Sequence, residues 1–356
     1  FLVTCVSEAD LFLWGNHMYY DLFERRVIRF HQGHHELRPI TPAWEIFWSL
    51  APEQTEAYIR TMSYRHVYDP DTGGFNRHDD GMQGHAFLEA GGIIAESLAW
   101  LYSKTKEQEL LALALAVARY SYHHRDLTTG LVINEPDKGR WDSKVCTTEI
   151  GLWAQCLLRA WTFTQNEEFL EMARQATHAY LEHAYDAESG QFFGQVRVQD
   201  GKPVIPDAPG YWPRRYTDPW NTDQWPNHDY PMPLAEACLS LHALTGDRRY
   251  RRAVNRLARI VMSGRPARTG RWAYAENYGR CIHLLTRAGR ALDEEDYLAD
   301  ASRLADEAVD GLYEHGKFQG YPGDHVYESV DGVGYLLLAL IELETSEQLD
   351  YRGFGL

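Results

Sequence analysis

The sequence predicts an all-α protein of the (α/α)6 toroid class, in which six helical hairpins close into a double ring. Three observations lead to this prediction. A turn motif, Asp-x-x-Thr/Ser-Gly with an apolar side chain within the next two residues, recurs about every 60 residues, as stacked supersecondary units do. A second motif, Thr-x-polar-x-x-apolar, alternates with it. The segments between the motifs carry apolar residues at spacings of three and four, which indicates amphipathic helices. Copies of the first motif begin at Asp69, Asp126 and Asp186, and copies of the second begin at Thr105, Thr164 and Thr245.

The motifs divide the chain into six inner and six outer helices. Inner helices are expected at 43–50, 84–102, 147–164, 231–245, 274–289 and 329–344. Outer helices are expected at 7–30, 54–66, 107–123, 167–184, 248–262 and 295–313. Turns after the inner helices are short, as antiparallel neighbours require, whereas the connections after the outer helices are long. All long loops then lie on one face, and that face is expected to hold the active site.

Composition sets limits on the class of protein. The chain has 356 residues with 44% hydrophobic content, and its uninterrupted repeat predicts a single domain over 1–356. A formal net charge of -16 disfavours nucleic acid and anionic membranes as partners. No stretch approaches the roughly 18 apolar residues of a membrane span. The cysteines are odd in number and have no CxxC spacing, which predicts reduced thiols.

The sequence says less about the cellular location and the oligomeric state of the protein. No signal peptide is visible, because the first residues lack a basic region. A cytoplasmic or periplasmic location of the bacterial type is expected, and a homodimer is possible.

The first long loop, 66–84, has two halves of different character. Pro70, Gly73 and Gly74 predict a tight turn, in which Pro70 sets φ and the glycines supply positive φ. The second half places polar side chains just before an inner helix, where a purely structural turn does not need them. These side chains are Asn76, Arg77, His78, Asp79 and Asp80.

The loop 124–147 and the helix start that follows it contribute Trp141 and Glu149. One interpretation is that Glu149 is an ordinary acidic residue that complements the helix dipole. The other is that it is catalytic. The early His31–Glu36 cluster offers no His-x-x-x-His pair with a matching carboxylate, so neither a metal nor a cofactor is expected.

The largest loop, 185–231, is rich in aromatic side chains mixed with polar ones. Such a mixture is typical of sugar recognition, because aromatic rings pack on a pyranose while polar groups take its hydroxyls. The alternative is that the rings cover the mouth of the toroid or a dimer contact. The selected residues of this loop are Tyr211, Trp212, Arg215, Trp225, His228, Asp229 and Tyr230, and later segments add Glu276, Tyr278 and His325.

Two longer stretches resemble a known superfamily. The segments 68–78 and 327–337, together with the hairpin period, resemble the six-hairpin glycosidases. This superfamily includes glycoside hydrolases, uronate-directed hydrolases, some polysaccharide lyases and the N-acylglucosamine 2-epimerases. Within it, the two segments look most like the β-glucuronidases of glycoside hydrolase family 154. Fold alone does not fix function.

The residues favour a glycoside hydrolase acting on a uronic-acid-containing saccharide. Hydrolysis needs a proton donor and a second carboxylate, and the first pair chosen is Asp80 with Glu149, followed by Asp229. Helix N-termini and the forks of Arg77 and Arg215 would favour a uronate carboxylate.

Three other functions stay open at this point. A lyase would use a Tyr or His base. A sugar epimerase or isomerase would use paired histidines such as His78, His228 or His325. A noncatalytic carbohydrate-binding protein would tolerate the loss of every loop carboxylate.

Overall fold

The structure is a computed structural model that describes residues 18–29, 35–136, 141–206, 214–222, 228–271, 273–323 and 332–352. Across these ranges the chain is mainly helical, with twelve helices and eight short strands. It forms two compact units. Unit 1 comprises residues 1–145, 152–180 and 197–201, and unit 2 comprises 146–151, 181–196 and 202–356. A single domain over the whole chain stays a prediction.

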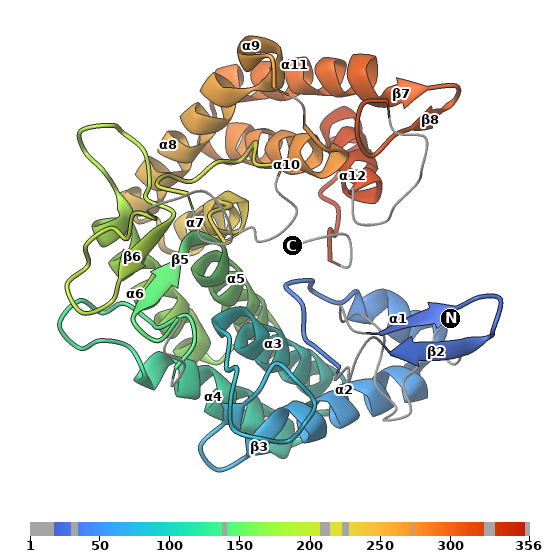
Figure 1. Cartoon of the computed structure of the whole chain (residues 1–356), viewed down its shortest axis with the longest axis vertical. Coiled ribbons are helices and arrows are strands. Elements are labelled where there is room, and N and C mark those ends of the chain that lie inside the picture. The colour runs from blue at the N-terminus through green and yellow to red at the C-terminus, as the bar shows by residue number, and fades with distance from the viewer. Residues whose placement is uncertain are drawn as a thin grey trace. The chain divides into compact units, whose positions relative to one another are not determined.

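Unit 1 is built around a buried helix, α3 (Leu88–Thr105). All its residues from Leu88 to Leu101 are buried, and it packs against α2 (Pro52–His66) and α4 (Gln108–His123) (Figure 1). The short helix α1 (Trp44–Leu50) precedes α2. Two β-hairpins also belong to this unit: β1 (Met18–Asp21) with β2 (Arg26–Arg29), and β3 (Val67–Asp69) with β4 (Gly74–Phe75).

Unit 2 is built around α10 (Ala275–Leu292), which contacts four other helices (Figure 1). These are α7 (Met232–Thr245), α8 (Arg248–Gly264), α11 (Glu295–Leu312) and α12 (Val333–Thr345). A single turn, α9 (Pro266–Thr269), follows α8, and β7 (Tyr313–Glu314) pairs with β8 (Lys317–Phe318). The chain passes between the units within α5 (Thr147–Thr164) and α6 (Glu167–Ala184), and at the strands β5 (Lys144–Cys146) and β6 (Gln195–Arg197).

The Thr-x-polar motif forms the same turn each time it occurs. The residue after Thr is left-handed at Lys106, Gln165 and Gly246, with φ of 64°, 55° and 68°. In each turn the Thr hydroxyl accepts a hydrogen bond from the backbone N–H two residues later. The apolar residue that ends the motif is buried in the following helix. The motif therefore ends one helix and starts its antiparallel partner.

The Asp-x-x-Thr/Ser-Gly motif forms a second recurring turn. The carboxylates of Asp69, Asp126 and Asp186 each accept hydrogen bonds from the residues two and three positions later. The glycine that closes each turn has a φ of 75–76°. Gly73 supplies positive φ in the first copy, but Gly74 does not, because it pairs in β4. Both repeats seen in the sequence are thus repeats of structure.

One predicted helix is wrong in the part that the structure describes. Residues 18–29 of the predicted helix 7–30 form the β1–β2 hairpin, and 7–17 lie outside the described residues. Tyr19, Tyr20, Val27 and Ile28 are aromatic or β-branched, which suits strands. Asp21 accepts hydrogen bonds from the N–H groups of two turn residues, and this competes with a helix. Each of the other predicted helices has a counterpart in the structure.

Candidate functional site

The first turn of α5 and the segment before α7 are held together closely in unit 2. The Thr148 N–H donates to the His228 carbonyl at 3.1 Å, and the Thr148 hydroxyl bonds both backbone groups of Tyr230 at 2.9 and 3.1 Å. A Cβ atom on Gly151 would lie only 2.3 Å from the backbone nitrogen of Leu234. A side chain at this position would hold the two helix starts apart, so glycine is required for their close approach.

This contact places the Glu149 carboxylate against the imidazole of His228. Oε1 of Glu149 is hydrogen-bonded to Nδ1 of His228, and the two residues are only 3% and 9% exposed. A proton on Nδ1 is donated to the carboxylate, which fixes the tautomer and leaves Nε2 as the basic nitrogen. The structure thus brings together two residues that the sequence selected for separate reasons.

Asp229 holds the neighbouring loop. Its Oδ2 accepts a hydrogen bond from the Arg214 N–H at 2.8 Å, and its Oδ1 accepts one from the Asn221 amide at 3.1 Å. Burial raises the pKa of this carboxyl, while the Arg214 and Asn221 contacts act in the opposite direction. Because both oxygens are engaged, we interpret Asp229 as a residue that shapes the site.

A fully buried arginine lies between two carboxylates on the inner helices of unit 2. Arg280 in α10 is 0% exposed; its Nε donates to Glu276 Oε1 at 3.1 Å, and its Nη1 is 3.8 Å from Glu236 Oε1. Its guanidinium lies over the rings of Tyr335 and Tyr230, at 4.7 and 5.8 Å. Within the described residues neither Nη atom has a hydrogen-bond partner, and the same holds for the Tyr230 hydroxyl.

His283 lies one turn further along α10. Its Nδ1 is 2.7 Å from the Tyr335 hydroxyl and 3.6 Å from Glu236 Oε1, and its ring stacks on Tyr351 at 3.9 Å. Burial holds its pKa well below the ordinary value, and the nearby positive charges of Arg287 and Arg280 act in the same direction. The imidazole is therefore neutral at pH 7.

Sequence reasoning missed these helix-borne residues because it searched loops and helix starts. Glu236, Arg280, His283 and Tyr335 lie inside helices, on faces that also carry buried apolar residues. A charged side chain on a buried helical face is rare unless it is paired or functional, and that signal was present in the sequence.

Unit 1 contains a second polar group. Arg77 Nη2 pairs with Glu36 Oε1 at 2.9 Å, and His85 Nδ1 is 2.9 Å from Glu135 Oε1. The ring of His78 packs edge-on against that of His85 at 5.0 Å. Burial lowers the pKa of His78 to about 4, and the charge of Arg77 contributes to this shift.

Asp80 has a clear local role in unit 1. Its Oδ1 accepts hydrogen bonds from the Asn76 amide at 2.8 Å and from the Met82 N–H at 2.9 Å. These bonds fix the turn that leads to α3. The carboxylate is partly exposed, so it also stays accessible to a ligand.

The remaining predicted residues fall into three groups. Trp141 is buried beside Phe87, with Lys144 over its ring. Arg215 is exposed over the Tyr216 ring, and Tyr278 packs against Trp220. Tyr211, Trp212, Trp225 and His325 lie outside the described residues.

Metal-binding clusters and membrane-spanning helices are both absent from the described part of the chain. No group of three or more His, Cys, Asp or Glu side chains there is arranged to hold a metal ion. No helix of that part is both long and apolar enough to cross a membrane.

Comparisons with known proteins identify the fold that carries these residues. Residues 1–90 match the family model described as periplasmic pectate lyase. A D-mannose isomerase structure is 14% identical, with 97% of this chain and 93% of that chain covered and a TM-score of 0.65. The GH76 α-mannanase of Bacteroides thetaiotaomicron is 14% identical, with coverage of 97% and 95% and a TM-score of 0.55.

A uronide-directed enzyme is also similar. The unsaturated glucuronyl hydrolase of Bacillus sp. GL1 is 14% identical, with coverage of 85% and 84% and a TM-score of 0.56. These proteins share the six-hairpin glycosidase fold. The all-α, (α/α)6 toroid class that the sequence predicts is thereby confirmed.

Proposed function

We propose that this protein is a carbohydrate-active enzyme, a glycoside hydrolase that acts on a uronic-acid-containing saccharide. Its site is a group of buried polar residues in unit 2 that we call the polar centre: Glu149, His228, Tyr230, Arg280 and His283. The observation that carries the proposal is a set of buried polar atoms without hydrogen-bond partners among the described residues. They are Glu149 Oε2, the Tyr230 hydroxyl, Arg280 Nη1 and Nη2, and His283 Nε2. Buried polar groups rarely lack partners in folded proteins, so a set of them is expected to face a polar ligand.

Carboxylates for acid–base catalysis surround this centre. Hydrolysis requires a proton donor and a second carboxylate that activates water or attacks directly. Within unit 2 Glu149 is the first choice, and Asp80, the partner selected from the sequence, stays a proposal. Glu276 and Glu236 are further candidates, because both lie within 4 Å of the Arg280 guanidinium and are partly exposed. Which carboxylate acts as the acid depends on the bound substrate.

Arg280 is the best-supported group for holding a uronate. Its two Nη atoms have no hydrogen-bond partner among the described residues, and together they form a fork that matches a carboxylate. Two loop arginines of this unit, Arg214 and Arg271, both pair with Asp218. The likeness to a glucuronyl hydrolase and to the pectate lyase model supports an acidic sugar. A β-glucuronidase of family 154 type is the nearest specific proposal.

A second function is favoured by the contact between Glu149 and His228. A carboxylate that orients a histidine is the arrangement of a general base, which a sugar isomerase, an epimerase or a lyase would use to remove a proton from carbon. The buried His283 supplies a second imidazole in the same unit. In this alternative, Arg280 and Tyr230 would stabilise the developing negative charge.

One set of parallel assays separates these functions. The protein is incubated with 4-nitrophenyl β-glucuronide, with neutral nitrophenyl glycosides, with oligogalacturonate and with free hexoses. Hydrolysis releases nitrophenol, a lyase generates the absorbance of an unsaturated uronate, and an isomerase changes the sugar spectrum in NMR. The proposal expects release from the glucuronide alone. If unsaturated uronate forms, or if a free hexose is isomerised, while no nitrophenol is released, the second function replaces hydrolysis.

A further inference from the structure

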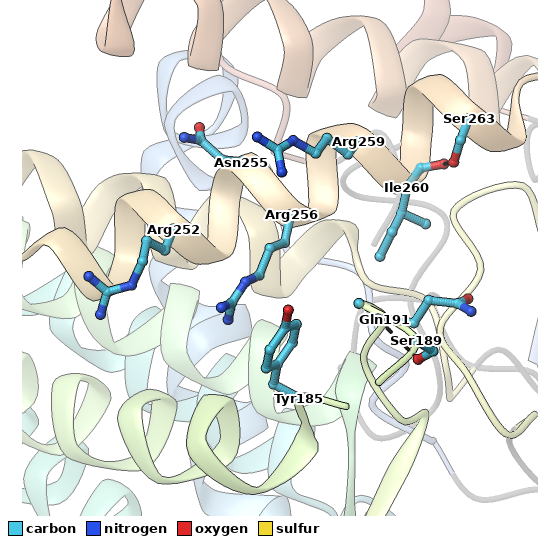
Figure 2. A pocket seen from close by; sticks show the side chains of 10 residues that line it. Tyr185, Ser189, Gln191, Arg252, Asn255, Arg256, Arg259, Ile260 and Ser263 are labelled. Atoms are coloured by element: carbon cyan, nitrogen blue, oxygen red, sulfur yellow. Dashed lines mark hydrogen bonds between the residues drawn. The ribbon is translucent and has the colours of Figure 1, made fainter. Parts of the chain in front are cut away.

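A pocket lies on α8 of unit 2, and no residue of the inner helices lines it. It has a volume of about 780 Å3 and is bordered by α8 and by the turn that follows α6 (Figure 2). A pocket of this size is in the range of small-ligand sites. None of its lining residues belongs to the Glu149–His228 or Arg280 groups, so the proposed hydrolysis does not explain it. We call it the α8 groove.

Three arginines of α8 line the groove. Arg252, Arg256 and Arg259 follow each other at spacings of four and three residues, which places them on one face of the helix (Figure 2). No Asp or Glu of the described chain lies within ion-pair distance of any of the three. By contrast, Arg249 and Arg251 of the same helix pair with Asp247 and Glu294.

The surroundings keep this positive charge available. No acidic side chain lines the groove, although the whole chain has a net charge of -16. Two carboxylates adjoin lining residues in the sequence. Asp186 is engaged by the hydroxyls of Tyr216 and Ser189, and Glu188 is not among the residues that line the groove. The Arg256 guanidinium lies 3.4 Å from the centre of the Tyr185 ring, and this contact orients its fork. An anionic ligand would therefore be attracted locally by a protein that repels anions overall.

The other lining groups narrow the ligand class. Asn255 and Gln191 offer amide groups beside the three arginines (Figure 2). The hydroxyls of Ser189 and Ser263 donate to Asp186 and to the Ile260 carbonyl, so they are available to a ligand as acceptors. The side-chain amide oxygen of Asn255 accepts a hydrogen bond from the Tyr297 hydroxyl at 3.1 Å, which leaves its NH2 group as a donor. Carboxylates suit the guanidinium forks, and sugar hydroxyls suit the amides and serines. This combination matches an acidic oligosaccharide better than a bare inorganic anion.

We propose that the α8 groove binds an acidic oligosaccharide, with the arginines on its carboxylates and the neutral polar groups on its hydroxyls. Such a site would hold a polymeric or oligomeric acidic chain on the enzyme surface. The binding does not depend on the chemistry of the polar centre, so it can be tested whether or not the protein is a hydrolase.

The test is a calorimetric titration of the full chain with trigalacturonate, with neutral maltotriose and with inorganic sulfate as comparison probes. All variants are made in a Glu149→Gln background, so that turnover does not disturb the titration. Arg252→Gln, Arg256→Gln and Arg259→Gln remove the groove charges singly. Each is expected to weaken the groove's binding of trigalacturonate about tenfold, as the loss of a charge-assisted hydrogen bond predicts.

Arg251→Gln is the matched control, because it removes the same charge from the same helix but pairs with Glu294 outside the groove. It should leave the titration unchanged, and maltotriose should show no difference between any of the proteins. The proposal is overturned if the groove variants bind trigalacturonate like the control. It is also overturned if sulfate binds the groove as tightly as the trisaccharide, because the site would then recognise small anions only.

Discussion

The carboxylate of Glu149 is hydrogen-bonded to Nδ1 of His228, although the two residues are 79 positions apart in the chain. Three backbone and hydroxyl hydrogen bonds of Thr148 hold the surrounding segments in place. The contact therefore follows from the docking of two helix starts. Any chemistry at either residue is expected to depend on the other.

Substitution of this pair should abolish turnover without unfolding the protein. Glu149→Gln and His228→Gln change little volume, and each should lower kcat by at least about 100-fold, the lower range for acid–base assistance. If Glu149 acts directly on the glycosidic oxygen or water, its variant should lose more activity than the histidine variant. If His228 is the base, the order should be reversed.

The control for this experiment is a residue of the same segment with a structural role. Asp229→Asn removes a charge but keeps one acceptor oxygen for the Arg214 N–H. On our interpretation it should lower stability more than kcat. Circular dichroism and melting temperature establish that every variant is folded, and near-normal turnover in both variants of the pair would exclude it from the mechanism.

Asp80→Asn tests the proposed partner in unit 1. If Asp80 supplies the second carboxylate, kcat should fall by about 100-fold or more while the melting temperature changes little. If its hydrogen bonds to Asn76 and Met82 are its main role, the melting temperature should fall and kcat should not. In the second case Glu276→Gln and Glu236→Gln are the next variants to assay.

Arg280 should determine the preference for acidic sugars. Arg280→Lys keeps one charge but loses the planar fork, so the affinity for a glucuronide should fall about tenfold or more, as expected for a charged hydrogen bond worth about 1.5–3 kcal/mol. Binding of neutral glycosides should change little. Inhibition constants for glucuronate and glucose give this comparison, and equal losses for both sugars would contradict a carboxylate contact. Arg271→Lys serves as the control, because Arg271 lies in the same unit and forms an ion pair with Asp218.

These residues show how far the sequence could predict the site. Periodicity and turn motifs predicted nearly all helices, because each Thr-x-polar turn determines its own left-handed residue locally. Helix starts were also readable, and they supplied Glu149 and His228. The interior residues Arg280 and Glu236 were missed because their role depends on which helical faces meet in α7 and α10. Such pairings are tertiary, and no local motif encodes them.

The close approach of α5 and α7 predicts a specific stability effect. Gly151→Ala would place a methyl group against the backbone of Leu234, so the helix starts must separate, and we expect a loss of about 1–3 kcal/mol, as overpacking typically costs. Turnover should fall as well, since Glu149 and His228 move apart. Gly311→Ala is the matched control, because it lies in α11 with open space around its Cβ position. It should be neutral or slightly stabilising.

Stability should fall at mildly acidic pH because buried histidines must remain neutral in the fold. Burial holds the pKa of His66 and His283 well below 6.5, with His35 adding to the effect at His66. The unfolded chain therefore binds more protons than the folded chain below pH 6.5, and the free energy of unfolding decreases as pH falls. Above that pH the contribution is fully present. Each group adds at most about 1.4 kcal/mol per pH unit to the slope.

Urea unfolding at a series of pH values between 8 and 5 measures this slope, and single-histidine variants assign it. His283→Gln should be less stable at pH 8, because the contact with Tyr335 is altered, but its stability should depend less on pH. His315→Gln is the control, since the His315 side chain is 85% exposed. A slope that is the same in His66→Gln, His283→Gln and the control would mean that carboxylates alone govern acid unfolding. His283 would then be able to take up a proton in the folded protein, and that would strengthen the case for it as a second acid–base group.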